Sequence, residues 1–212
     1  MVYEVENDKI PFYTQYVSVI IIIINVIVFV IQLFDPTGYM FIYEAAFIPD
    51  EFFAGIKAWT IFTSMWMHAD FIHIIMNMWF FYIVADNCEK EMGHVLFLIT
   101  YMISGLVGSL LHALISIVFE WGAIPSLGAS GAIMGMIACY GILFPNNKLR
   151  ILGFMGAVSA KTFIIITFLT ELIYGLISLF YLSGTAHFAH VGGFFVGLIV
   201  ALVLKSTKKR KT

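Results

Sequence analysis

The residues with the clearest chemical potential are a serine and a histidine at the starts of two apolar stretches. Ser130 occurs in Gly-Ala-Ser-Gly, and His190 follows a second histidine, His187, by three residues. A serine hydroxyl is a weak nucleophile until a base takes its proton, and a neutral imidazole can do so near pH 7. Ser130 and His190 therefore suggest nucleophilic catalysis, and the small residues around the serine permit a close approach of the backbone.

Two further polar residues could supply what such a reaction needs next, which is a set of donors for an oxyanion. His73 and Asn77 are four residues apart, so they share one face of a helix. Both side chains carry N–H groups, and backbone amides near the serine can add more. We therefore expect His73 and Asn77 to contribute to an oxyanion hole.

The composition places these residues in a membrane protein. Of 212 residues, 61% are hydrophobic and 11% are charged, whereas about 25% are charged in a soluble domain. The mean hydropathy is +0.98, and too few polar residues are present to cover a compact soluble protein. A soluble enzyme, a disordered tail and a disulfide-stapled secreted domain are excluded. The net charge of −2 provides no general basic footprint for nucleic acid.

Six apolar stretches predict an all-α bundle of six transmembrane helices. They cover residues 17–34, 71–85, 95–119, 127–144, 162–182 and 188–204, and a spanning helix needs about 20 residues. We expect one domain over 1–212, with a short N-terminal segment over about 1–16 and a basic tail over about 205–212. The second stretch is the weakest on length. The long loop over 35–70 is rich in aromatic residues, so we expect it to lie in or on the outer leaflet.

Lysine and arginine predict the orientation of these spans. Both termini of a six-span chain lie on one side, and placing them in the cytoplasm puts ten of the eleven basic residues inside and only Lys57 outside. Spans two, four and six then begin at the outer face and deliver the serine, histidine and amide side chains to a similar depth. We expect a multi-pass protein of the cell membrane whose active site opens to the extracytoplasmic side.

Small residues favour close packing of the fourth and sixth spans. The fourth contains Gly131-x-x-x-Gly135 and the sixth contains Gly193-x-x-x-Gly197. Such spacing lets two membrane helices approach closely, which would bring the candidate nucleophile towards the candidate base.

Other interpretations stay open for single residues. A serine in a membrane helix often bonds to its own backbone. His187 and His190 could bind a metal with His68 and His73, but the sequence lacks H-E-x-x-H and a cysteine pair at zinc spacing, so we expect no metal and no cofactor. Glu171, mid-way along the fifth span, is either a proton-relay or transport residue or a protonated carboxyl bonded to another helix, and we favour the second.

Three motifs in order resemble those of the rhomboid family of intramembrane serine proteases. Residues 73–77 are similar to the family's H-x-x-x-N on its second helix, 128–131 to G-x-S-G on its fourth, and 189–197 to A-H-x-x-G-x-x-x-G on its sixth. The resemblance extends over about 17–204. It implies a rhomboid-like fold with Ser130 as nucleophile and His190 as general base of a dyad that has no acidic third member. It also implies an oxyanion hole made by His73, Asn77 and the backbone N–H of Ser130.

The same resemblance implies a hydrolase, a serine endopeptidase that cleaves transmembrane protein substrates at or just inside the bilayer. It associates the fifth helix with substrate entry, which would place Glu171 on a mobile element. The sequence departs from some members at Met134, where they carry a tyrosine, and at Glu89-Lys90-Glu91, where they carry Glu-x-Arg. Two other functions stay open: a catalytically silent rhomboid-like protein that binds transmembrane helices, and a small membrane transporter. The expected partners are transmembrane substrates and the lipid bilayer, with no nucleic acid and no prediction of oligomeric state.

Overall fold

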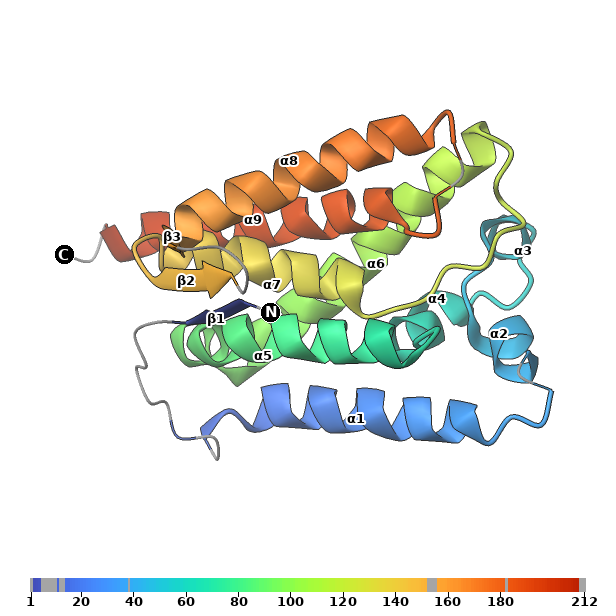
Figure 1. Cartoon of the computed structure of the whole chain (residues 1–212), viewed down its shortest axis with the longest axis horizontal. Helices are drawn as coiled ribbons and strands as arrows, with labels where there is room; N and C mark the ends of the chain where they lie inside the picture. Colours follow the sequence, from blue (N-terminus) through green and yellow to red (C-terminus); the bar gives the residue numbers. More distant parts are fainter. Residues whose placement is uncertain are drawn as a thin grey trace.

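The computed structural model describes residues 2–4, 11, 14–37, 39–151, 156–181 and 183–209, and it is mostly helical (Figure 1). The long helices are α1 (Tyr16–Leu33), α5 (Phe71–Met92), α6 (His94–Val118), α7 (Ser130–Leu143), α8 (Ala160–Ser178) and α9 (His187–Lys209). Short helical segments lie between α1 and α5: α2 (Met40–Ala45), α3 (Pro49–Phe53), α4 (Thr60–Thr63) and the 3₁₀ helix η2 (Ser64–Trp66). The prediction of a helical bundle is confirmed.

Five helices, α1, α5, α6, α8 and α9, are long and apolar enough to cross a membrane. The second stretch, which is the weakest on length in the sequence, extends beyond its expected end at residue 85, because α5 has 22 residues and continues through a polar segment to Met92. That segment is accommodated because Asn87, Cys88 and Glu89 are buried against protein. The shortest of the six is α7, with 14 residues.

The short helix α7 is the centre of the bundle. All residues over 131–141 are buried, so every side of the helix is covered by protein. It packs against α5, α6, α8 and α9. Figure 1 shows α1 on the far side of α5 from α7, α8 on the far side of α9 from α7, and α6 running obliquely to the other helices. A helix that is apolar all round can be buried in protein or in lipid, and the burial of residues 131–141 shows that α7 is buried in protein.

Glycines set the distance between α7 and α9. A Cβ on Gly193 would overlap the carbonyl oxygen of Gly131, and a Cβ on Gly197 would overlap that of Gly135. The two backbones are therefore in direct contact, and Cys139 Sγ also lies 3.2 Å from the Gly197 carbonyl oxygen. Since α7 begins with Ser130 and α9 with His187, this packing holds the starts of the two helices together.

The segment with the short helices α2, α3 and α4 lies at the end of the bundle where α5, α7 and α9 begin (Figure 1). It is tied to the loop before α7 by paired backbone bonds, Phe47 N–H to Ser126 O at 2.9 Å and Ser126 N–H to Phe47 O at 2.8 Å. The Gln32 side chain makes two bonds to the backbone of His68, at 3.0 and 3.1 Å, and so joins the end of α1 to the residues before α5.

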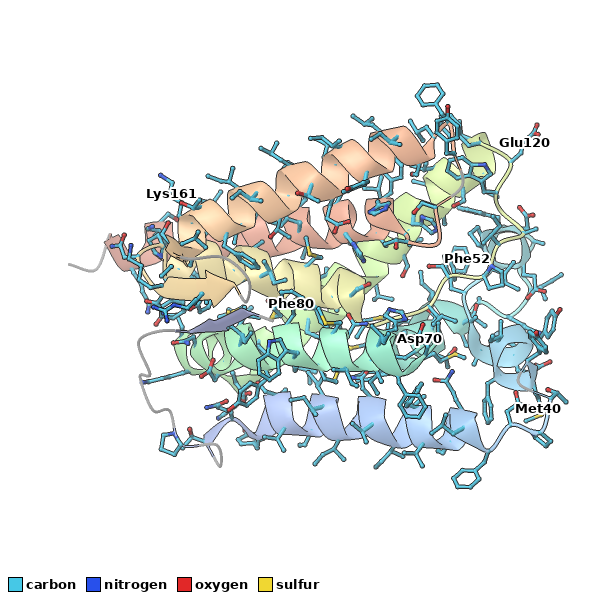
Figure 2. The ribbon with its side chains drawn as sticks, in the orientation of Figure 1. Met40, Phe52, Asp70, Phe80, Glu120 and Lys161 are labelled. Carbon is cyan, nitrogen blue, oxygen red and sulfur yellow. The ribbon has the colours of Figure 1, made fainter. Side chains whose placement is uncertain are left out.

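The opposite end carries an element that the all-α prediction missed. Strands β1 (Val2–Glu4), β2 (Lys148–Ile151) and β3 (Ala157–Ser159) form an antiparallel sheet in the order β1-β2-β3. Arg150 pairs with Tyr3 on one side and Ala157 on the other. In Figure 2, Lys161 lies at this end, and Asp70 and Glu120 lie at the end where α5 starts and α6 finishes.

Candidate active site

Ser130 and His190 are within hydrogen-bonding distance of each other. His190 Nε2 lies 2.7 Å from Ser130 Oγ, and His190 Nδ1 lies 2.7 Å from an oxygen of Glu171. An ionised carboxylate only accepts hydrogen bonds, so it places the imidazole proton on Nδ1 and leaves Nε2 to accept from the serine hydroxyl. This is the geometry that activates a serine nucleophile.

The turn before α7 presents the serine and the free backbone of the helix start. Ser130 is the first residue of α7, and the first N–H groups of a helix have no acceptor within the helix. Gly128 has φ +126°, and a Cβ there would lie 2.9 Å from His73 Nε2. Only glycine fits this turn, because both the backbone angle and the histidine ring exclude a side chain.

His73 and Asn77 lie near the start of α5 and face the same space. Asp70 caps α5 by accepting from the His73 backbone N–H at 2.8 Å. The Ala69 N–H donates to His73 Nδ1 at 3.2 Å, so in the neutral ring Nε2 carries the proton and can donate. Asn77 is buried, and its Nδ2 has no hydrogen-bond partner among the residues that the structure describes.

These side chains line a single cavity of about 760 Å³. Its walls come from α5, α6, α7, α8 and the start of α9, with the loops 121–127 and 183–186 beside them. The buried Met134 lines it one turn from Ser130, at the position where some rhomboids carry a tyrosine. The cavity extends along α5 and α8 to Phe80 and Phe163, whose rings stack at 6.4 Å and 19°.

Glu171 on α8 is bound to both histidines at the start of α9. Its Oε2 lies 2.8 Å from His187 Nδ1 and 2.7 Å from His190 Nδ1. A protonated carboxyl has one proton and could donate to only one of these nitrogens, whereas a carboxylate accepts from both. The expectation of a bond to another helix agrees with this geometry, but the shared oxygen favours the carboxylate over the protonated form that we expected.

The same three residues form the group in the described part of the chain that could hold a metal ion. The candidate ligand atoms of Glu171, His187 and His190 lie within 4.8 Å of one another. His68 and His73, the other ligands considered from the sequence, are not in this group. Their rings lie 5.1 Å apart, and burial, with His73 beside it, lowers the pKa of His68 to about 4.

Comparison with known proteins agrees with the motifs and the fold. The family model of the rhomboid domain matches residues 56–207. "RHOMBOID-like protein 6, mitochondrial" of Arabidopsis thaliana is 33% identical over 150 residues, which cover 71% of this chain and 45% of that protein. "Rhomboid-like protease 3" of Toxoplasma gondii is 33% identical over 93 residues, covering 44% of this chain and 33% of the relative.

A third relative is named as inactive. "Inactive RHOMBOID-like protein 8" of Arabidopsis thaliana is 29% identical over 139 residues, covering 65% of this chain and 36% of that protein. The chain thus spans less than half the length of these relatives. The match of the rhomboid domain to most of the chain, together with the apolar helices, identifies a multi-pass membrane protein that belongs to the rhomboid family.

Proposed function

We propose that this chain is an intramembrane serine endopeptidase that cleaves transmembrane protein substrates, with Ser130 as nucleophile and His190 as general base. The observation that carries the proposal is the 2.7 Å contact between Ser130 Oγ and His190 Nε2 at the wall of the cavity. The name of the Toxoplasma relative supports protease chemistry in the family, and the inactive relative shows that family membership alone does not decide activity.

In the proposed reaction, His190 Nε2 takes the Ser130 proton as Oγ attacks the scissile carbonyl carbon. The oxyanion that forms is bound by Asn77 Nδ2–H, His73 Nε2–H and the backbone N–H of Ser130. The imidazolium then gives its proton to the amine as the C–N bond breaks. A water molecule next gives a proton to Nε2 and hydrolyses the acyl ester, and that proton returns to Oγ as the acid is released.

The unpaired amide of Asn77 is the main support for the oxyanion hole. A buried N–H without a partner costs about 1–3 kcal/mol. Asn77 is among the residues that line the cavity, and its Nδ2 is a buried donor of this kind. A donor that is unsatisfied before the reaction and bonded during it stabilises the transition state more than the ground state.

We also propose six spans, with both termini in the cytoplasm of a cell-membrane protein and the long loop over 35–70 at the outer leaflet. Ser130 is the first residue of α7, which starts at the end of the bundle where α5 starts (Figure 1), and Figure 2 shows Asp70 at that end and Lys161 at the other. In intact cells, a cysteine introduced at Glu44 should react with an impermeant thiol reagent and one at Lys209 should not. The reverse pattern would place the site on the other side.

The function is tested with protein purified in detergent and a set of model transmembrane substrates. Wild type should cleave a substrate and should be labelled by a serine-directed fluorophosphonate. Ser130→Ala should lose both cleavage and labelling. Its melting temperature should stay unchanged, because only one hydroxyl is removed. Cleavage at the wild-type rate by Ser130→Ala would overturn the assignment of the nucleophile. Binding of substrates without cleavage or labelling by the wild type would instead support the catalytically silent function.

A further inference from the structure

We propose that Glu171 is the third member of the catalytic group and positions His190, so that this rhomboid works with a serine–histidine–glutamate triad. The inference rests on the proposed function. Ser130, His190 and Glu171 come from three different helices, α7, α9 and α8, and are joined by two contacts of 2.7 Å each.

The first contribution of Glu171 is to fix the proton on the imidazole. A neutral histidine carries its proton on either Nδ1 or Nε2, and only the Nδ1 form can accept from Ser130. The carboxylate beside Nδ1 favours that form and holds the ring plane towards the serine. Without it, part of the enzyme has the proton on Nε2 and cannot deprotonate Ser130.

The second contribution is to the charge that develops during the reaction. When the Ser130 proton moves to Nε2, His190 becomes a cation whose side chain is only 12% exposed. An unpaired charge in such surroundings is costly. The Glu171 carboxylate, 2.7 Å from Nδ1, pairs with this cation. The Nδ1 proton stays on His190, so no proton is transferred to Glu171.

His187 holds Glu171 in place rather than competing for the serine. Its Nδ1 lies 2.8 Å from the same oxygen of Glu171. Its ring stacks on Tyr174 at 5.7 Å and 20°, and Tyr174 lies one turn along α8 from Glu171. His187 is thus fixed between α8 and α9, where it limits the conformations of the carboxylate.

Because Glu171 is on α8, the triad is complete only when α8 packs closely against α9. This helix packs against α7 and α9, and its other face carries exposed apolar side chains such as Ile166, Leu169 and Ile173. A movement of α8 away from α9 would lengthen the contact between Glu171 and His190 without moving Ser130. In the proposed triad, the activation of the nucleophile therefore depends on the packing of α8 against α9.

The experiment compares Glu171→Gln and Glu171→Asp with Ser130→Ala and with Thr170→Val, an exposed neighbour on α8. Gln keeps the size of the side chain and removes the charge, whereas Asp keeps the charge and shortens the chain. We measure kcat and KM on the model substrate, the rate of fluorophosphonate labelling, and the melting temperature. Loss of the acid in a serine triad costs about 10⁴-fold in kcat.

We expect Glu171→Gln to lower kcat and the labelling rate in parallel, by about 10²–10⁴-fold, with little change in KM. Asp should retain more activity than Gln, whereas a role in packing alone predicts the opposite order. This order is read per folded protein, so it holds even if both variants are destabilised. Thr170→Val should behave as wild type.

Two outcomes separate this inference from the function on which it rests. If Ser130→Ala is inactive but Glu171→Gln keeps the wild-type kcat and labelling rate, the triad is wrong and the Ser130–His190 dyad stands. If Ser130→Ala cleaves at the wild-type rate, the proposed function itself is wrong.

Discussion

Two glutamates bound to histidines lie at opposite ends of this bundle, and they differ in what the rest of each cluster touches. Glu89 accepts from the backbone N–H groups of Val17 and Ser18 at 3.1 and 2.8 Å, from the Ser18 hydroxyl, and lies 2.6 Å from His94 Nδ1. Among the residues that the structure describes, Glu171 is bound by two imidazoles, and one of these contacts Ser130. The two glutamate–histidine pairs therefore have different roles at the two ends of the bundle.

The Glu89 cluster joins three helices. It satisfies the start of α1, whose N-cap residue Gln15 makes no side-chain cap bond, and it links α5 to the first residue of α6. The Glu89 side chain is fully buried, and the His94 ring lies against Tyr16 at 3.9 Å. The contacts of the Glu89 oxygens all hold helices together, whereas the cavity beside Glu171 leaves room for a substrate. We therefore attribute the proposed catalytic role of the Glu171–His190 pair to the Ser130 hydroxyl, which is the third group that the histidine ring contacts.

The largest effect expected from this comparison is at His190. His190→Ala should lower kcat by about 10⁴-fold or more, because the base and its contact with Ser130 are lost together. The melting temperature should fall by no more than a few degrees, since no backbone group depends on this ring. Cleavage assays and thermal unfolding in the same detergent measure both quantities. If His190→Ala stays active and His187→Ala is inactive, the assignment of the base is wrong.

A smaller effect on catalysis than that of His190→Ala is expected at Asn77. Loss of one oxyanion donor costs about 10²–10³-fold, or roughly 3–4 kcal/mol, in kcat, and His73 can reduce the loss by sharing the oxyanion. KM should change less than kcat. Asn77→Asp should be at least as damaging near neutral pH, because an ionised side chain repels the oxyanion.

The melting temperature tests the alternative that Asn77 has a structural role. If this side chain instead ties α5 to a neighbouring helix, Asn77→Ala should lower the melting temperature, and activity should fall only with the folded fraction. A well-folded Asn77→Ala variant with normal kcat would leave His73 and the backbone as the oxyanion donors.

Substitution of Glu89 is expected to lower stability and to leave kcat unchanged. Glu89→Ala removes bonds to two backbone N–H groups and to His94, so we expect a loss of about 2–4 kcal/mol in the free energy of unfolding. The kcat of the folded fraction should stay near that of wild type. Glu91→Ala is the matched control, since the ion pair of Glu91 with Lys208 is partly exposed and contributes about 0–1 kcal/mol. Normal stability with reduced kcat in Glu89→Ala would remove the contrast between the two clusters.

The sequence predicted most of the bundle because apolar runs and small-residue spacing are local signals. The glycine spacing in 131–135 and 193–197 anticipated the backbone contact between α7 and α9. The length of α5 was missed, because its polar end is buried against other helices and hydropathy alone reads it as a loop. The small sheet was missed because β1 pairs with a strand almost 150 residues away, and strands of three or four residues carry no clear periodicity.

The site was predictable in its residue types but not in its connections. The motifs pointed to Ser130, His190, His73 and Asn77, while the resemblance implied a dyad with no acid. A signal for Glu171 was nevertheless present. It lies seven residues before the end of α8 and His190 lies three after the start of α9, which is about 10 and 5 Å from the same end of the bundle. The missing information was the rotation of α8 about its axis, which depends on its neighbours.

The smallest expected effect is at His187, and it tests whether a histidine can hold a positioning carboxylate in the way that His94 contacts Glu89. His187→Ala frees one side of Glu171 but leaves its contact with His190 possible. Ordering a glutamate side chain that has regained its rotamer freedom costs up to about 1.5–2 kcal/mol, and the remaining contact with His190 offsets part of this cost. We therefore expect kcat to fall by roughly fivefold, about 1 kcal/mol in the barrier, with KM unchanged. His94→Ala should instead lower the melting temperature and leave kcat unchanged, because its carboxylate holds helix ends rather than a base. A loss of kcat in His187→Ala as large as that in His190→Ala would mean that His187 takes part in proton transfer. An unchanged kcat would mean that the contact with His190 and the packing of α8 are enough to hold Glu171.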